Sequence, residues 1–95
     1  MFIVNITYKV SLDIIDKHLK DHVEYLDEQY AVGNFIASGR KIPRTGGVIL
    51  SNLSNKKELL KILEKDPFSI HDLANYKITE FIPSKTSEAL KFLIK

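Results

Sequence analysis

Cysteine and tryptophan are both absent from the 95-residue chain. Without cysteine there can be no disulfide bond, no thiolate catalysis and no cysteine-ligated metal, and the absence fits a reducing compartment. No apolar run approaches the ~20 residues that cross a bilayer. The opening residues MFIVNITYKV lack the basic region and long apolar core of a signal peptide. We therefore expect a cytoplasmic protein with no membrane partner.

Neither sign of charge is in large excess. Lysine and arginine number 14 against 12 acidic residues, which gives a formal net charge of +2, and the two signs are interleaved. Nucleic-acid binding depends on a concentrated basic stripe, so no nucleic-acid partner is expected. The pair Gly46-Gly47 lacks the spacing and the lysine of a phosphate loop. No cofactor is therefore expected.

The length predicts one domain over residues 1–95, with a core at 1–83 and a C-terminal helix at 84–95. A chain this short leaves much of its surface unburied and is only marginally stable alone. Association with a second copy would help to stabilise it.

The clearest local pattern is a predicted antiparallel hairpin. Two short apolar runs, at 35–38 and 48–50, flank a stretch of turn residues. Pro43 suits a tight turn, and Gly46 and Gly47 allow positive φ or close backbone approach. Both faces of this hairpin are partly apolar, so we expect both to be covered.

Before the hairpin, alternation of apolar and polar residues predicts a strand over 2–9. Ser11 can cap a helix that runs to Val32 and ends at Gly33, a residue suited to the left-handed cap. At 100° per residue this helix has one apolar stripe, with His22 in its middle. The stripe consists of Leu12, Ile15, Leu19, Leu26 and Tyr30.

After the hairpin, Asn55 and Glu58 form a capping-box-like start for a second helix that stops near Asp66. Pro67 favours an extended conformation at Asp66. A loop then leads to a last strand at 76–82, and residues 84–95 read as a short amphipathic helix.

The element order is β-α-β-β-α-β plus a terminal helix, which is typical of the ferredoxin-like α+β fold with a four-stranded antiparallel sheet and helices on one face. The uncovered face predicts a two-fold homodimer with a barrel-like interior. Further assembly through the terminal helix stays open.

At this point the chain resembles the YCII-related (YciI-like) family of small dimeric α+β barrels. The resemblance covers residues 2–83 and depends on several motifs in order. They are Tyr8, His22 followed by Tyr25 and Leu26, Phe35-Ile36-Ala37-Ser38-Gly39, Pro43-Arg44-Thr45-Gly46-Gly47, and Asp66-Pro67-Phe68 followed by Tyr76 and Phe81. Where family members commonly have Ser-Gly-Pro, this chain has Ser38-Gly39-Arg40, so turn geometry and pocket charge should differ.

The resemblance implies a site that pairs His22 with Asp66. It also implies lyase- or isomerase-like activity, since the fold is similar to that of muconolactone isomerase barrels. In such a dyad the carboxylate would fix the imidazole tautomer, and the other nitrogen would move a substrate proton. The alternative is a buried pair that only ties the first helix to the exit of the second.

Other residues near the hairpin are candidates for substrate binding. Arg40 and Arg44 could clamp a carboxylate, although two solvated guanidinium groups at a turn would give the same sequence. The full set of candidate binding residues is Tyr8, Ser38, Gly39, Arg40 and Arg44.

His18 and His22 stand four residues apart, a spacing that can present two nitrogens to one metal. A third ligand is missing, so no metal site is expected. The leading functional hypothesis is a small enzyme that moves a proton on a compact acidic or lactone-like metabolite. A non-catalytic module that binds a small molecule and a purely structural oligomer remain alternatives.

Overall fold

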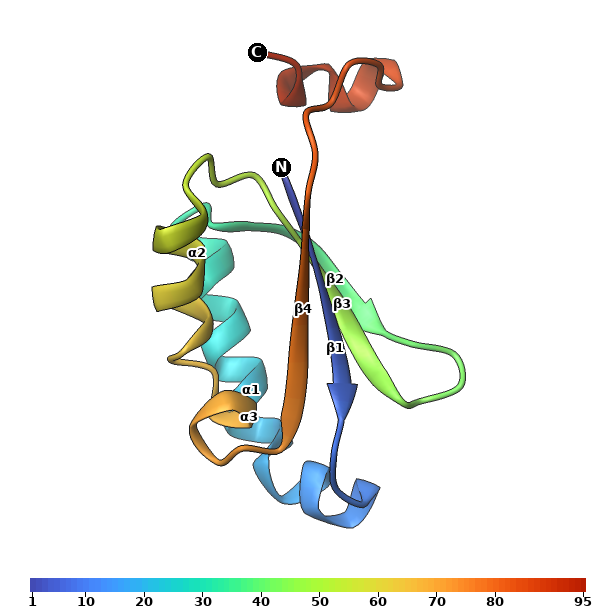
Figure 1. The fold of residues 1–95 in the computed structure, drawn as a ribbon, viewed down its shortest axis with the longest axis vertical. Helices are drawn as coiled ribbons and strands as arrows, with labels where there is room; N and C mark the ends of the chain where they lie inside the picture. The colour runs from blue at the N-terminus through green and yellow to red at the C-terminus, as the bar shows by residue number, and fades with distance from the viewer.

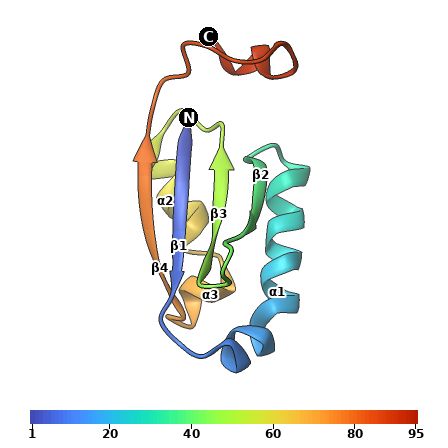
Figure 2. The same cartoon turned by 90° about the vertical axis from the view of Figure 1, so that its right-hand side faces the viewer.

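A four-stranded antiparallel sheet organises the chain in the computed structural model, which describes residues 1–95. Its strands are β1 (Phe2–Tyr8), β2 (Phe35–Arg40), β3 (Gly46–Ser51) and β4 (Ala74–Glu80). Their order across the sheet is β2-β3-β1-β4. Figure 2 shows the strands side by side, with β2 and β4 at the two edges.

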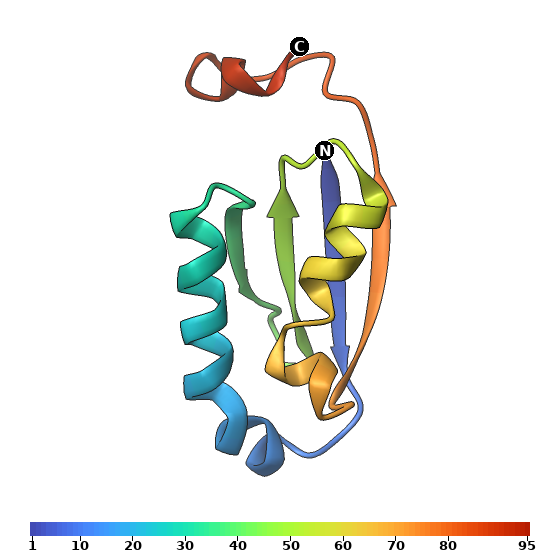
Figure 3. The same cartoon turned by 90° about the vertical axis from the view of Figure 1, so that its left-hand side faces the viewer.

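The helices cover one face of this sheet. They are α1 (Leu12–Ala31), α2 (Lys56–Leu63) and the short α3 (Pro67–Ile70). Figure 1 shows all three on the same side, and Figure 3 shows α1 beside the β2 edge with α2 and α3 over the other half of the sheet. This arrangement confirms the expected ferredoxin-like α+β fold.

The core lies between the sheet and the helices. In β1 the alternating residues Phe2, Val4 and Ile6 are buried, as their period of two predicts. Helix residue Ile15 and the α2 residue Leu59 pack against them from the other layer. The central position of β1 in the sheet therefore places the first strand at the centre of the core.

The helix-free face of the sheet is apolar on one half only. Ile3 of β1 pairs with Leu50 of β3, and both are half-buried, as is Val48 of β3. Asn5 pairs with Val48 on one side and with Lys77 on the other, and both Asn5 and Lys77 are exposed. The hairpin thus has apolar residues on both of its faces, with Ile49 on the buried side. An apolar patch on β3 and the start of β1 is left uncovered within one chain.

Helix α1 buries only part of the stripe that periodicity predicts, since Ile15 is in the core and Leu26 packs against it. Tyr25 and Gln29 are buried with Ile15, whereas Leu12 is 41% exposed, and Leu19 and Tyr30 are each 37% exposed. The reason is the position of α1 at the sheet edge, where only part of its circumference meets the core.

The two ends of α1 lie where the sequence predicts them, but only one of the two predicted caps forms. Gly33 has φ +81° and closes the C-terminus as expected. At the other end Ser11 occupies the N-cap position, but its side chain makes no capping hydrogen bond.

The loop predicted after α2 is wrong in part, because residues 67–70 form α3. Asp66 is extended, with φ −65° and ψ 127°, as Pro67 requires, and its side chain caps α3 by accepting the Phe68 N–H. Proline at the first helical position and aspartate before it are both favourable for a helix start. The same Asp-Pro pair that ends one helix therefore begins another.

The C-terminal elements also differ from expectation. Strand β4 begins and ends two residues earlier than predicted, because its pairing with β1 runs from Ala74 opposite Tyr8 to Glu80 opposite Phe2. The expected helix at 84–95 is a 3-10 helix over Glu88–Leu93. An isolated helix this short is marginal without tertiary packing, and Figures 1 to 3 show the segment beyond the end of the sheet.

None of the helices has both the length and the apolar character that a bilayer span requires.

Candidate active site

His22 of α1 lines a cavity, and Asp66, which precedes α3, lies behind it. The Nδ1 atom of His22 lies 2.7 Å from Oδ1 of Asp66. The Asp66 side chain is fully buried, and 12% of the His22 side chain is exposed. The pair expected from the sequence is therefore within hydrogen-bond distance.

Two further hydrogen bonds to Asp66 indicate which tautomer of His22 fits the pair. The Phe68 N–H donates to Oδ1 at 3.0 Å, and the Tyr76 hydroxyl donates to Oδ2 at 2.6 Å. Because both oxygens of Asp66 already act as acceptors, a donor nitrogen on His22 matches them best. In the tautomer that fits this arrangement, the Nδ1–H of His22 donates to Oδ1 of Asp66, and Nε2 keeps its lone pair.

The plane of the imidazole ring is fixed by stacking. The rings of His22 and Phe68 are 4.0 Å apart and inclined by only 8°. Phe68 is itself buried, and the Tyr8 ring meets it edge-on at 5.9 Å. His22 is thus held from two directions, by Asp66 in the ring plane and by Phe68 on a ring face.

Two tyrosines, the buried Tyr25 and the half-buried Tyr76, complete the surroundings of the carboxylate. Burial, and next the negative charge of Asp66, raise the pKa of Tyr76 far above its ordinary range. The same two causes in the same order raise the pKa of Tyr25, whose hydroxyl donates to the Ile62 carbonyl at 2.8 Å. Both tyrosines therefore remain neutral hydrogen-bond donors across the physiological range.

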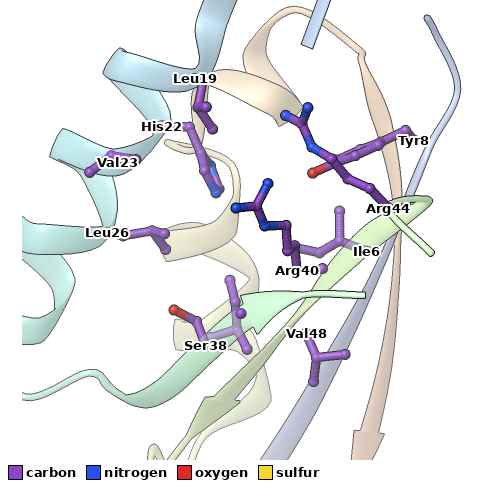
Figure 4. A pocket seen from close by; sticks show the side chains of 13 residues that line it. Ile6, Tyr8, Leu19, His22, Val23, Leu26, Ser38, Arg40, Arg44 and Val48 are labelled. Carbon is purple, nitrogen blue, oxygen red and sulfur yellow. The ribbon is translucent and has the colours of Figure 1, made fainter. Parts of the chain in front are cut away.

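A cavity of about 300 Å³ opens between α1, β1 and the β2-β3 hairpin. Figure 4 shows the side chains around it, with His22 directed inward from α1. This volume is at the lower end of the range for small-molecule sites. The lining residues are Ile6, Tyr8, Leu19, His22, Val23, Leu26, Ser38, Gly39, Arg40, Arg44, Gly47, Val48 and Ile49.

All five residues predicted to bind substrate lie on this cavity wall. Tyr8 is at the end of β1, Ser38, Gly39 and Arg40 are in β2, and Arg44 follows in the hairpin turn. Asp66 does not line the cavity and lies behind His22. The structure thus brings the predicted residues together, while their roles remain predictions.

Several of these side chains are already engaged. Arg44 Nη2 lies 2.6 Å from Asp16 Oδ1, and this hydrogen bond is the main cause that raises the pKa of Arg44. The Ser38 hydroxyl accepts a 2.6 Å hydrogen bond from Tyr30 and can still donate its own proton. Arg40 takes part in none of the four ion pairs of the chain.

The two histidines of α1 do not converge. The His18 ring stacks on His71, with centroids 4.3 Å apart, while His22 bonds to Asp66. The structure contains no cluster of three or more histidine, aspartate or glutamate side chains placed to hold a metal ion.

Some residues that shape the site were not predicted from the sequence. Tyr76, Phe68 and Asp16 contact the candidate residues directly, and Val23 adds to the apolar wall. The Asp-Pro-Phe motif could have indicated Phe68, because a cap and its second helical residue lie close together. Tyr76 and Asp16 carry no local signal, since their contacts depend on the packing of distant elements.

Comparisons with known proteins agree with this architecture. The family model of the YCII-related domain matches residues 1–82, so the chain belongs to the YCII-related family. No curated protein shows significant sequence similarity to it.

A solved structure with the same fold is the 5-chloro-2-hydroxyhydroquinone dehydrochlorinase TftG from Burkholderia phenoliruptrix, in complex with 2,5-dihydroxybenzoquinone. The two chains are 17% identical, with a TM-score of 0.71, over 85% of this chain and 93% of the other. At this identity the likeness establishes the fold.

Proposed function

We propose that this protein is a small enzyme of the lyase or isomerase type, in which His22 moves a proton on a compact acidic or lactone-like substrate. The observation that carries the proposal is the position of His22. Its Nδ1 atom is bonded to a fully buried carboxylate, while its ring lines an open cavity of about 300 Å³. Proton transfer requires a base that is held in a fixed orientation and is within reach of the substrate. Here Asp66 would hold the imidazole ring, and the cavity would admit the substrate.

The proposed step begins with Nε2 of His22 taking a proton from a substrate carbon. The electron pair of the broken C–H bond forms a new double bond. In an elimination the leaving group departs with its own bonding electrons, and in an isomerisation the imidazolium returns the proton to another carbon. Asp66 stabilises the transient imidazolium through the Nδ1 hydrogen bond.

The cavity wall supports a substrate of modest size and acidic character. Leu19, Leu26 and Ile6 give it apolar sides, and arginine side chains give it positive charge. The dehydrochlorinase of the same fold binds 2,5-dihydroxybenzoquinone, a small planar compound whose hydroxyl groups are acidic enols. This compound is therefore a rational first probe.

The test is a thermal-shift screen of small carboxylic acids, lactones and 2,5-dihydroxybenzoquinone, followed by turnover of each hit. His22→Asn keeps an amide near the Nδ1 position but removes Nε2. We expect its turnover to fall by ~10²–10⁴-fold, the usual contribution of a general base. The matched control is His18→Asn, one helical turn away and outside the cavity, which should retain the wild-type rate.

Two outcomes would count against the proposal. One is turnover by His22→Asn at the wild-type rate. The other is a set of compounds that bind the wild-type protein and are never consumed, which would favour the alternative of a non-catalytic binding module.

A further inference from the structure

The two arginines that line the cavity differ in whether a carboxylate of the chain pairs with them. Arg44 is held by Asp16 at 2.6 Å, and that carboxylate neutralises much of its charge. Arg40 forms no ion pair and no side-chain hydrogen bond with the rest of the chain. One guanidinium group at the cavity is therefore free to bind a ligand.

No carboxylate of the chain lines the cavity, so none is placed there to form an ion pair with Arg40. Its lining residues include two arginines and a histidine but no aspartate or glutamate. The nearby Asp66 is fully buried and already accepts from His22. An anionic ligand is therefore the natural counter-charge, and a carboxylate fits the planar fork of a guanidinium with two parallel hydrogen bonds.

The pairing of β2 with β3 directs Arg40 into the cavity. Arg40 lies opposite Gly47, which has no side chain to fill the space beside it. Figure 4 shows the Arg40 side chain extending toward α1, into the same space as His22. The residue is exposed, so it reaches this position without the cost of burying an unpaired charge.

The rest of the cavity limits the shape of the ligand. Leu19, Val23 and Leu26 of α1 face Ile6 and Ile49 of the sheet across it. A space of about 300 Å³ between two apolar walls suits a single ring or a short chain.

We infer that Arg40 is the residue that binds the anionic group of the ligand, and that the site selects small planar carboxylates or comparably acidic enols. The ligand body lies between α1 and the sheet, and Arg44 has the separate task of joining the hairpin to α1. Binding of the anionic group by Arg40 does not depend on the proposed function. Placing the reacting carbon of the bound ligand beside Nε2 of His22 does rest on that function.

The test is calorimetric titration with benzoate and with benzamide, which share a ring and differ in charge. We expect wild-type protein to bind benzoate at least about tenfold more tightly than benzamide, because charge-assisted hydrogen bonds are worth that much or more. Arg40→Gln should remove this preference and leave benzamide binding unchanged. Arg40→Lys should keep part of it, since the charge remains and the fork is lost.

Lys41→Gln is the matched control, because it removes the same charge one residue away. Lys41 Nζ lies 3.2 Å from Thr7 Oγ1, and Lys41 does not line the cavity. The preference for benzoate should persist in this variant. Loss of the preference in Lys41→Gln as well, equal binding of the two probes, or no binding of benzoate at millimolar concentration would overturn the inference.

This outcome is separable from that of the proposed function. The titration measures equilibrium binding, so it gives the same answer whether or not any compound is turned over. His22→Asn should retain the preference for benzoate, and failure of turnover in that variant would leave the role of Arg40 intact.

Discussion

The Asp66 carboxylate accepts hydrogen bonds from three parts of the chain: the His22 side chain on α1, the Phe68 backbone in α3 and the Tyr76 hydroxyl on β4. It is fully buried, so water cannot replace these bonds when the acceptor is removed. The residue therefore links three elements as well as orienting the histidine.

Replacement of Asp66 should lower stability in a graded way. Asp66→Ala leaves buried donors without an acceptor, and we expect the free energy of unfolding to fall by roughly 3 kcal/mol, the upper part of the range for such groups. Asp66→Asn keeps an oxygen for the Phe68 N–H and should cost only about 1 kcal/mol. Urea denaturation followed by circular dichroism measures both values, and equal losses would contradict this account.

Tyr76 should give the protein a specific sensitivity to alkali. Its pKa is raised by folding, so the folded chain keeps this proton where the unfolded chain, with an ordinary tyrosine pKa of about 10, has lost it. The contribution to stability is complete below about pH 10 and decreases as the pH rises further. Tyr76→Phe should flatten this alkaline decrease, besides losing about 1 kcal/mol at neutral pH with the hydrogen bond.

Urea titrations of wild type and Tyr76→Phe from about pH 7 to pH 11 test this directly. Tyr25 also has a raised pKa, so some alkaline loss should remain in the variant. Parallel curves for the two proteins would show that Tyr76 does not contribute to the pH dependence.

Among the residues of the site, the pair His22 and Asp66 was predicted from the family resemblance. The extended backbone at Asp66 was predicted from Pro67, which follows it. It could not indicate Tyr76 as the third partner. That contact requires the register of β4 on β1, in which Tyr76 lies opposite Ile6 on the helix-covered face. Register is a property of the paired strands, and a shift of one residue would have turned Tyr76 to the other face.

The pairing of β3 with β1 requires a glycine at position 46. A Cβ atom at Gly46 would lie 1.8 Å from the backbone oxygen of Ile6, whereas one at Gly39 would meet nothing within 4 Å. The close neighbour is backbone in the central strand and cannot move aside without breaking the ladder. Gly46 is therefore required by close approach of two strands.

Gly46→Ala should lower the free energy of unfolding by roughly 3 kcal/mol or more, as expected when a core strand must shift. Gly39→Ala is the matched control in the neighbouring strand and should change stability by less than ~0.5 kcal/mol. Thermal and urea denaturation of the two variants provide the measurement. A mild effect at Gly46 would mean that β1 and β3 pair less tightly than described.

Element prediction succeeded where a local pattern determines the structure. The period of two in β1 and the Asn55 cap of α2 both gave the right element, and the Asn55 side chain does accept the Glu58 N–H. The prediction failed for α3, a single turn too short to show periodicity, and for the tail, where amphipathic spacing indicated an α-helix. The buried stripe of α1 was predicted only in part: Ile15 and Leu26 were right, but the burial of Tyr25 and Gln29 depends on the position of the helix at the sheet edge.

For the whole molecule, the uncovered sheet face remains the basis for expecting a homodimer. Ile3, Val48 and Leu50 form an apolar patch there, and a chain of this length gains stability by covering it with the same patch of a second copy. We expect light scattering to show a dimer at micromolar concentration.

Leu50→Lys should shift this equilibrium to monomer, because the dimer would bury an unpaired charge. Glu64→Lys, just after α2, is a larger change of charge because it replaces a negative side chain with a positive one, and it should still leave the dimer intact. A wild-type monomer at micromolar concentration, or a dimer that Leu50→Lys does not weaken, would exclude this interface.

The cavity is built from two sets of elements with different places in the fold. His22, the proposed proton-transfer group, depends on α1, the α2-α3 junction and β4, which are joined through part-buried hydrogen bonds. Ser38, Gly39 and Arg40 lie on β2, an edge strand paired only with β3. Mutations that arise in this strand during evolution can therefore change the shape and charge of the cavity wall while His22 keeps its hydrogen bond to Asp66. Under the proposed function, divergence toward new substrates by single substitutions would follow from having the binding residues on the sheet edge and the histidine held by the core.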